Sequence, residues 1–294
     1  MAHFNFLKPA FKNSAIVPKA LLAATIWLGS LSANAQVATG YNFSQSAGTF
    51  TLATFNVFYG NPDLPGIARA IADTKADLVC LQETNADSER HLRRAFASRY
   101  PYMMFRGGVD QDGMAVLSAR PLTTLEFVPP KHGLFGSWLF QTSIAGTNVQ
   151  FAIVHLNPPD VNSANSVAGL LRMFERAGEV QTREVATLWE RLSTNQPLVV
   201  LGDFNGFASG PAVGFLRYRG LRNSTESLPT GKARAGTWSP PGLSALLNLR
   251  IDHVLHSRHF TAIEERVLPT QASDHRPLVV TFRLVQTATG SAIN

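Results

Sequence analysis

The sequence of 294 residues predicts an α/β domain built on mixed β-sheets. Apolar, β-branched runs of strand length alternate with segments of helical period. The alternation is irregular, and several strands follow one another without an intervening helix, which argues against a simple array of parallel strands and crossover helices. Residues 49–285 could pack two sheets face to face with helices outside. No linker divides this segment, so we expect one domain.

Residues 1–35 have the pattern of a secretory signal. Three lysines and no acidic residue precede an apolar run over residues 20–31, and Ala-Asn-Ala follows at 33–35. This order predicts export to the periplasm or the medium, with cleavage after Ala35. The apolar run is short for a membrane span, and an uncleaved anchor is the alternative. Residues 36–48 are expected to form a polar linker, and residues 286–294 a loose tail.

The composition is that of a globular protein with a small net charge. Hydrophobic residues make up 45% and charged residues 16% of the chain, which excludes a disordered protein. Three of the 26 basic residues and none of the 20 acidic residues lie in the signal, which leaves 23 against 20, or only +3. Whole-chain charge therefore says little about partners. Cys80 is the only cysteine, so no intrachain disulfide can form, and its apolar neighbours predict a buried, inert thiol.

The first half of the domain is rich in strands. Aromatic and β-branched residues over 49–58 predict the first strand, and apolar residues at 64, 67, 68 and 71 then follow helical spacing. An apolar run over 77–82 predicts a buried second strand. Residues 87–99 are expected to be helical, with four arginines on a solvated face or, alternatively, in contact with a polyanion. Short strands are expected at 102–105, 114–118, 122–127 and 138–144.

The second half contains the longest predicted helix. Residues 148–156 predict a strand, and apolar residues over 166–192 repeat close to every 3.6 positions. Leu198-Val199-Val200-Leu201 then suits a strand covered on both faces. Residues 206–248 are rich in Gly, Pro and Ser and are expected to be mostly loop, with a short helix near 211–216. The last predicted strands are 249–255, 262–267 and 278–284.

Polar side chains gather where these strands end. They are Asn56, Glu83, His155, Asp203 with Asn205, Asp252, and the pair Asp274 and His275 before the last strand. Oxygen ligands such as Glu83, Asp274 and the Asn56 amide suit Mg²⁺ or Mn²⁺. Asp203 and His275 fit the roles of water-positioning group and proton carrier, and Asp252 fits a partner that holds the imidazole.

Each of these residues also has a structural interpretation. Gly202-Asp203-Phe204-Asn205 could be a solvated turn, since Gly, Asp and Asn favour turns. His155 could simply cap a strand, and Glu83 could be a solvated turn residue. Asp252 could pair with Arg250 or His253 in place of His275.

Six short motifs together resemble those of the endonuclease/exonuclease/phosphatase superfamily. That superfamily includes deoxyribonuclease I-like nucleases, exonuclease III-like repair enzymes, neutral sphingomyelinases and inositol polyphosphate 5-phosphatases. Each motif is weak alone, but all six occur in the order of the family and span the chain after the linker. They are Phe55-Asn56-Val57, Leu81-Gln82-Glu83, Val154-His155, Gly202-Asp203-Phe204-Asn205, Ile251-Asp252-His253 and Ser273-Asp274-His275.

The resemblance implies a four-layer α/β sandwich and a phosphoester hydrolase that depends on Mg²⁺ or Mn²⁺. Glu83 would bind the metal, with Asn56 and Asp274 nearby. Asp203 would orient or deprotonate the attacking water, while Asn205 and His155 would hydrogen-bond phosphoryl oxygens. His275, paired with Asp252, would stabilise the charge of the transition state or assist proton transfer.

Substrate class stays open at the level of sequence, because one scaffold serves several phosphoesters. We expect a phosphodiester or phosphomonoester, with nucleic acid slightly favoured. A phospholipid or inositol-phosphate hydrolase is the alternative, and membrane contact would need an exposed aromatic hairpin, for which Phe135 to Phe140 is a weak candidate. A noncatalytic polyanion-binding protein on the same fold is the second alternative. No stable protein partner is expected, and the sequence does not indicate an oligomeric state.

Overall fold

Two six-stranded mixed sheets form the centre of the computed structural model, which describes residues 48–108, 110–160, 166–228, 235–239 and 248–285. The strand orders within these residues are β11-β12-β1-β2-β4-β3 and β5-β6-β7-β8-β10-β9. The first sheet contains β1 (Thr49–Asn56), β2 (Leu78–Gln82), β3 (Tyr102–Arg106), β4 (Met114–Ser118), β11 (Phe260–Val267) and β12 (Leu278–Leu284). The second contains β5 (Leu122–Val128), β6 (Ser137–Ile144), β7 (Thr147–His155), β8 (Leu198–Asp203), β9 (Arg222–Asn223) and β10 (Asp252–His256).

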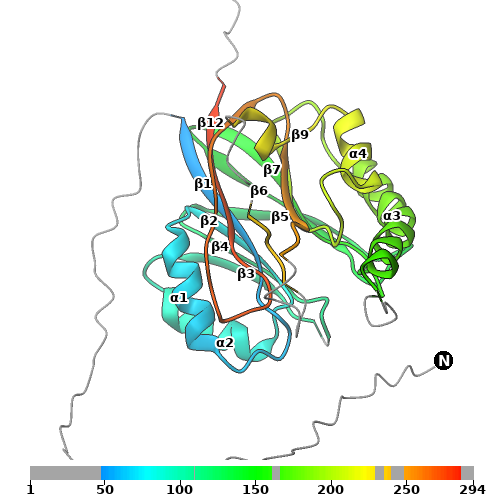
Figure 1. Ribbon diagram of the computed structural model, residues 1–294. Helices are drawn as coiled ribbons and strands as arrows, with labels where there is room; N and C mark the ends of the chain where they lie inside the picture. The colour runs from blue at the N-terminus through cyan, green and yellow to red at the C-terminus, as the bar shows by residue number, and fades with distance from the viewer. Residues whose placement is uncertain (1–47, 109, 161–165, 229–234, 240–247, 286–294) are drawn as a thin grey trace, which may run out of the picture. The chain divides into compact units, whose positions relative to one another are not determined.

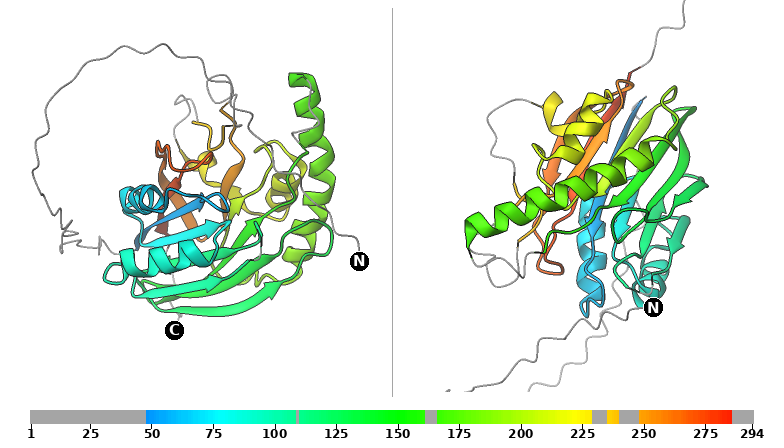
Figure 2. Two further views of the ribbon diagram at one scale, coloured as in Figure 1. Left: turned by 90° about the horizontal axis from the view of Figure 1, so that it is seen from below. Right: turned by 90° about the vertical axis from the view of Figure 1, so that its right-hand side faces the viewer.

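Helices cover the outer face of each sheet. Figure 1 shows α1 and α2 together at the lower left and α3 and α4 together at the right, and Figure 2 shows the sheets between them. The helices are α1 (Leu64–Thr74), α2 (Ala86–Phe96), α3 (Val167–Trp189) and α4 (Pro211–Tyr218), and a 3-10 turn, η2, spans Ser224–Ser227. The structure therefore confirms the predicted four-layer α/β sandwich.

Apolar side chains fill the three spaces between the four layers. Leu52, Phe151 and Leu201 lie in the core between the two sheets, together with Cys80. A second core packs α1 and α2 against the first sheet, and a third packs α3 and α4 against the second sheet. Burial raises the pKa of the Cys80 thiol, in agreement with the prediction of an inert cysteine.

The register of the strands brings the polar strand ends to one edge of the sandwich. Strand β1 runs parallel to β2, with Asn56 opposite Gln82. In the second sheet β7 runs parallel to β8, with His155 opposite Asp203, and antiparallel β10 places Asp252 opposite Asp203 from the other side. Each sheet thus contributes one parallel pair whose carboxyl ends carry candidate site residues.

Polar caps fix where the helices begin. The Asp63 side chain accepts a hydrogen bond from Gly66 N at 2.9 Å at the start of α1. Asn85 and Ser88 form a reciprocal capping box at the start of α2. Ser166 Oγ accepts from Gly169 N at 3.0 Å, so Ser166 caps α3, which begins at Val167, one residue after the predicted start, and ends at Trp189, three residues before the predicted end.

The structure differs from the sequence prediction at a few element ends. Strand β1 stops at Asn56 and not at Phe58, because Phe58 adopts a left-handed φ of 63° that leaves the sheet. Strand β10 starts at Asp252, three residues later than predicted. Strand β9 and the turn η2 were not predicted, since two-residue strands have no periodicity to detect.

The predicted signal and tail, most of the linker, and parts of the segment 206–248 lie outside the described residues. Among the described residues, no helix is both long enough and apolar enough to cross a membrane.

Candidate active site

Asn56 and Glu83 lie at the carboxyl ends of β1 and β2, and they contact each other. Asn56 Nδ2 donates to Glu83 Oε1 at 2.8 Å and to Asp203 Oδ2 at 3.1 Å. The other Glu83 oxygen accepts from Tyr59 N at 2.8 Å. Glu83 has a φ of 61°, which is rare for a residue with a side chain and is typical of strained functional sites. Burial raises the pKa of Glu83, and the charge of Asp274 raises it further.

Asp203 occupies the centre of the site, at the end of β8. It is 1% exposed, and its Oδ2 lies 3.5 Å from His275 Nε2 and 3.8 Å from His155 Nε2. Its Oδ1 accepts from Asn205 N at 2.8 Å, so the turn after β8 is closed by Asp203 itself. Burial raises the pKa of Asp203 to about 6. Solvated turn residues would not be buried in this way, which rules out the structural interpretation for Asp203.

Asn205 and His155 lie on the second-sheet side of Asp203. Asn205 has a φ of 48°, and its Nδ2 donates to Leu156 O at 3.0 Å. His155 Nδ1 donates to Gln111 O at 3.2 Å, so in the neutral ring Nε2 is the acceptor that faces the carboxylates. Burial lowers the pKa of His155, and the ring of Phe135 stacks on the imidazole at a centroid distance of 4.0 Å.

His275 is held between two carboxylates. Its Nδ1 donates to Asp252 Oδ2 at 2.9 Å, while Nε2 faces Asp203. Burial opposes protonation of His275, but the charges of Asp252 and Asp203 outweigh it and raise the pKa of His275 to about 10. Asp252 therefore pairs with His275, and the alternative partners have other contacts: Arg250 pairs with Glu265 at 2.8 Å, and His253 Nε2 bonds Gly206 O at 2.8 Å.

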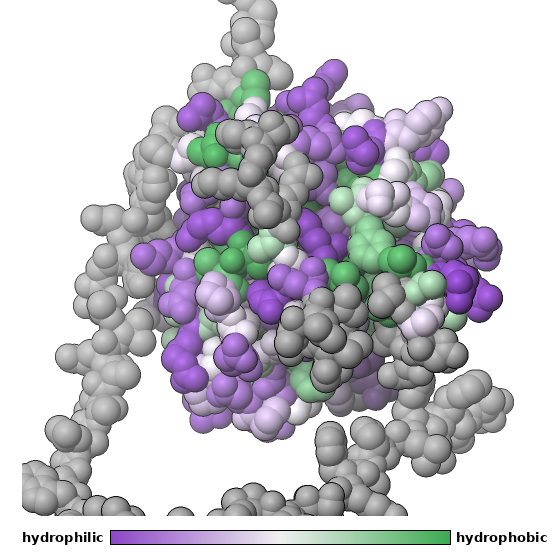
Figure 3. Space-filling model, viewed as in Figure 1, coloured by the Kyte–Doolittle hydropathy of each residue, from purple (hydrophilic) through white to green (hydrophobic). Residues whose placement is uncertain are grey.

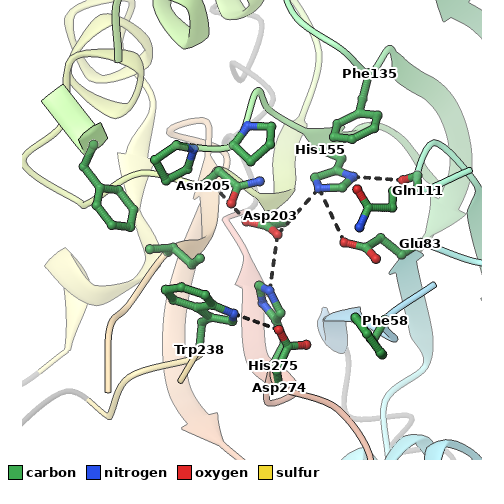
Figure 4. A pocket seen from close by; sticks show the side chains of 14 residues that line it. Phe58, Glu83, Gln111, Phe135, His155, Asp203, Asn205, Trp238, Asp274 and His275 are labelled. Atoms are coloured by element: carbon green, nitrogen blue, oxygen red, sulfur yellow. Dashed lines mark hydrogen bonds and ion pairs between the residues drawn. The ribbon is translucent and has the colours of Figure 1, made fainter. Parts of the chain in front are cut away.

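Asp274 lies half-buried at the mouth of the site. Its Oδ2 accepts from Trp238 Nε1 at 2.9 Å, and Ser273 Oγ donates to its Oδ1 at 3.3 Å. Ser273 Oγ also lies 2.9 Å from Asn56 O, which ties the segment before β12 to the end of β1. Figure 4 shows Asp203 at the centre, with His155 and Glu83 to its right and His275 and Asp274 below it.

The predicted residues surround one pocket of about 140 Å³. Six of the eight line it directly, namely Glu83, His155, Asp203, Asn205, Asp274 and His275. Asn56 and Asp252 stand immediately behind, each in contact with a lining residue. The structure thus brings all eight predicted residues together at one edge of the two sheets.

The chemistry of the pocket fits a divalent cation. Four carboxylates, from Glu83, Asp203, Asp252 and Asp274, face two imidazoles, and no lysine or arginine of the described residues lines the pocket. The excess negative charge and the hard oxygen atoms match the preferences of Mg²⁺ or Mn²⁺. Asp203, Asp252 and His275 have ligand atoms within 4.8 Å of one another, but both His275 nitrogens already face carboxylates. Glu83 and Asp274, at the open side, are therefore the better candidate ligands.

Sequence reasoning missed several residues that position the site. Thr237 Oγ1 accepts from Asp252 N at 3.0 Å, and Trp238 holds Asp274. Gln181 Nε2 donates to Asn157 O at 2.8 Å and to Asn205 O at 2.9 Å. A signal for Gln181 exists in the sequence, because it interrupts the apolar face of the long helix between Ala177 and Val185. Thr237 and Trp238 lie in a segment with no periodicity.

The aromatic hairpin considered for membrane contact is not exposed, which corrects that expectation. Phe135 is 8% exposed because it stacks on His155, and Trp138 and Phe140 are buried in the core between the sheets. The aromatic residues of this segment support the site and the core, so they offer no surface to a bilayer.

The fold and the site together define a class of protein. Its members are two-sheet α/β sandwiches with buried carboxylates and imidazoles at one edge. The chain belongs to the endonuclease/exonuclease/phosphatase family, whose sequence profile matches residues 53–275. Members of this family act on phosphoester bonds. No curated protein sequence matches the chain.

Solved structures share this fold at low sequence identity. An endonuclease/exonuclease/phosphatase from Beutenbergia cavernae has a TM-score of 0.59 and 20% identity, over 81% of this chain and 72% of that one. TDP2 from D. rerio, complexed with a single strand DNA product, has a TM-score of 0.61 and 17% identity, over 80% and 99%. The human nocturnin catalytic domain with bound sulfate has a TM-score of 0.59 and 15% identity, over 81% and 94%.

Proposed function

We propose that the protein is an exported, metal-dependent phosphoester hydrolase that acts by attack of an activated water. The observation that carries the proposal is the buried centre itself. Asp203, with a pKa of about 6, lies between two imidazoles and beside a carboxylate pair that suits a cation. A structural ion-pair network would not need this much uncompensated negative charge beside an open pocket.

Glu83 and Asp274 would hold the metal, and Asn56 would orient Glu83 through its amide N–H. A divalent ion bound there would polarise the phosphoryl group and offset its negative charge. Because Glu83 receives hydrogen bonds from both Asn56 and Tyr59 N, its carboxylate is fixed before any ligand arrives.

Asp203 is the group placed to accept a proton from the attacking water. Its pKa near 6 keeps most of the side chain ionised at neutral pH and still basic enough to take the proton. The protonated His275, held by Asp252, supplies a positive charge that faces the developing charge on phosphorus-bound oxygens. Asn205 and His155 would contact the remaining phosphoryl oxygens.

Nucleic acid is the substrate class that we favour. A relative of the same fold has been seen with a single strand DNA product, and another with a sulfate anion. The buried aromatic hairpin removes the feature that would have favoured a phospholipid. The signal-like residues 1–35 support action outside the cytoplasm.

The proposal is tested by hydrolysis assays on the purified full chain, with Mg²⁺ and with EDTA. The panel contains plasmid DNA, a single-stranded oligonucleotide, RNA, sphingomyelin, phosphatidylinositol phosphates and an aryl phosphodiester. Metal-dependent cleavage of one class is the expected result. Binding of a polyanion that persists in EDTA, without turnover of any substrate, would favour a noncatalytic protein.

The substitution Glu83→Gln tests the proposed metal-binding role of Glu83 separately from any role in stability. The substitution keeps the volume but removes the charge, so we expect turnover to fall more than about 100-fold, since changes one step removed from a bound metal already cost about 10- to 100-fold. Glu89→Gln is the matched control, because Glu89 pairs with Arg93 on the outer side of α2. Full activity of Glu83→Gln, with thermal unfolding unchanged, would refute the role of Glu83.

A further inference from the structure

The catalytic pocket is too small to hold a whole substrate. Its volume of about 140 Å³ compares with about 300–1,000 Å³ for pockets that enclose drug-sized ligands. A phosphoryl group and its immediate neighbours fill such a space. If the protein hydrolyses phosphoesters, as proposed above, the rest of the substrate must lie along the rim.

Phe58 is the exposed aromatic side chain on that rim. It lines the pocket beside Glu83 and is 45% exposed, although a large apolar ring gains free energy by burial. Figure 4 shows its ring on the side of Glu83 and Asp274 that is opposite Asn205. Phe58 N donates to Asn56 Oδ1 at 3.0 Å, and Tyr59 N donates to Glu83. The candidate metal residues therefore hold the strained backbone that presents this ring.

A second hollow of about 430 Å³ is lined by Gly60, which follows Phe58 by two residues. One wall is the turn from Gly60 to Pro62, and the other starts at Asn85 and continues along α2. Gly60 follows Phe58 by two positions, and Asn85 follows Glu83 by two positions, and both Phe58 and Glu83 line the catalytic pocket. Two residues of chain span at most about 7 Å. The hollow is therefore within reach of a substrate whose scissile group occupies the catalytic pocket.

Two arginines of α2, Arg90 and Arg94, line this hollow, in contrast to the catalytic pocket. His91 lines it with them. Arg90 pairs with Asp87, which also lines the hollow. Arg94 donates from Nε to Arg90 O at 3.1 Å and has no carboxylate partner within the part of the chain that the structure describes. Figure 3 shows a mainly hydrophilic surface over α1 and α2, at the lower left.

We propose that Phe58 and this hollow form a binding subsite for the neighbouring nucleotide of a single-stranded nucleic acid. The Phe58 ring stacks on an unpaired base, and Arg94 contacts the phosphate beyond it. Aromatic platforms beside a cationic groove are the usual means of binding single strands, whereas a paired base offers no free face. The helix start does not supply the anion site, since Asn85 Oδ1 already accepts from Asp87 N and Ser88 N.

Turnover by the full chain in Mg²⁺ tests the subsite with two substrates. One is a thymidine oligonucleotide of about ten residues. The other is methyl p-nitrophenyl phosphate, a small phosphodiester that contains no nucleotide. Phe58→Ala and Arg94→Ala should each lower the ratio of kcat/KM for the oligonucleotide to that for the small ester, and the loss in Phe58→Ala should be about 5- to 100-fold because a stacked base is lost. The loss should lie in KM. Phe58→Trp should keep the ratio, and Phe58→Leu should not.

Salt dependence distinguishes a phosphate contact from a structural effect. Loss of one contact in Arg94→Ala should reduce the slope of log KM against log salt by about 0.7 for a single strand. Arg183→Ala is the matched control, since Arg183 is an exposed arginine on α3 that pairs with Glu179 and lines neither hollow. An unchanged ratio in Phe58→Ala, or an unchanged ratio and slope in Arg94→Ala, would overturn the proposal. Equal dependence for duplex DNA would overturn its restriction to single strands.

Equilibrium binding keeps the test independent of the proposed chemistry. Fluorescence anisotropy of the labelled oligonucleotide in EDTA should show weaker binding for both variants than for the unaltered chain. If the unaltered chain binds in this way but cleaves nothing, the proposed function fails and the subsite stands. If it cleaves phosphoesters but both variants bind and cleave the oligonucleotide normally, the proposed function stands and the subsite is wrong.

Discussion

Asn56 joins the two halves of the site through a single amide group. Its nitrogen contacts one carboxylate from each sheet, Glu83 and Asp203, while its oxygen accepts from Phe58 N. The residue type and its place at a strand end were predictable from the sequence. The sequence did not predict which atom of the Asn56 amide faces the carboxylates. That orientation depends on the left-handed turn at Phe58, which no sequence pattern indicates.

Trp238 acts on the site through Asp274. Replacement Trp238→Phe keeps the packing with Phe174 and Ile251 but removes the N–H that bonds Asp274 Oδ2. We expect the Mg²⁺ concentration for half-maximal activity to rise about tenfold, because the carboxylate loses its orienting partner. Magnesium titration of turnover is the measurement, and Trp189→Phe on α3 is the control. An unaltered titration in Trp238→Phe would show that Asp274 does not need this bond.

The elements that carry the site are two parallel strand pairs, one in each sheet. Their positions were predictable, because β1, β2 and β8 are apolar runs of strand length. The position of α3 was predictable from its 3.6-residue apolar period. The pairing between strands far apart in sequence, such as Asp252 opposite Asp203, was not. The alternation of apolar residues shows which face of a strand is buried, but it does not identify the partner strand when that strand is distant in sequence.

Gly202 shows how closely two of these strands approach. Its φ is 142°, and a Cβ added there would collide with Val154 O of the neighbouring strand β7. Gly202→Ala should therefore lower the free energy of unfolding by about 2–4 kcal/mol and displace Asp203. Urea unfolding of the full chain measures this.

Gly214→Ala is the matched control for Gly202→Ala. Gly214 lies on the exposed face of α4, where a Cβ meets nothing within 4 Å, so the alanine should stabilise by about 0.5–1 kcal/mol. Equal urea midpoints for Gly202→Ala and the unaltered chain would contradict the close approach.

At the scale of the whole molecule, the long helix α3 links the outer layer to the wall of the pocket. Gln181 and, one turn later, Glu184 both bond the backbone of Asn157, the residue before the two prolines that line the pocket. Glu184 Oε2 accepts from Asn157 N at 2.9 Å, whereas its Oε1 is buried without a partner among the described residues. The fold therefore retains a carboxyl group that is costly to ionise.

Glu184 should make the stability of the protein depend on pH. Burial raises the pKa of Glu184 from its ordinary 4.5 to about 7. The folded chain then binds this proton more tightly than the unfolded chain, so stability falls as pH rises through that interval. The free energy of unfolding of Glu184→Gln, relative to that of the unaltered chain, should rise by about 1–2 kcal/mol from about pH 5 to about pH 8. This figure allows for the partial exposure of Glu184.

Urea unfolding at the two pH values, with Glu179→Gln as the control on the exposed face of α3, measures the difference. A difference between Glu184→Gln and the unaltered chain that does not change with pH would show that Glu184 is ionised in the folded protein without cost.

Among the described residues, the last strand pairs with the first. Strand β12 lies beside β1, and Asp274 and His275 come only a few residues before it. Among the described residues, a ribosome therefore completes the other strands and helices of the sandwich before it makes Asp274, His275 and the strand that covers the edge of β1. A chain that stops before Asp274 would lack two of the eight candidate site residues, and without β12 it would also leave one edge of β1 unpaired.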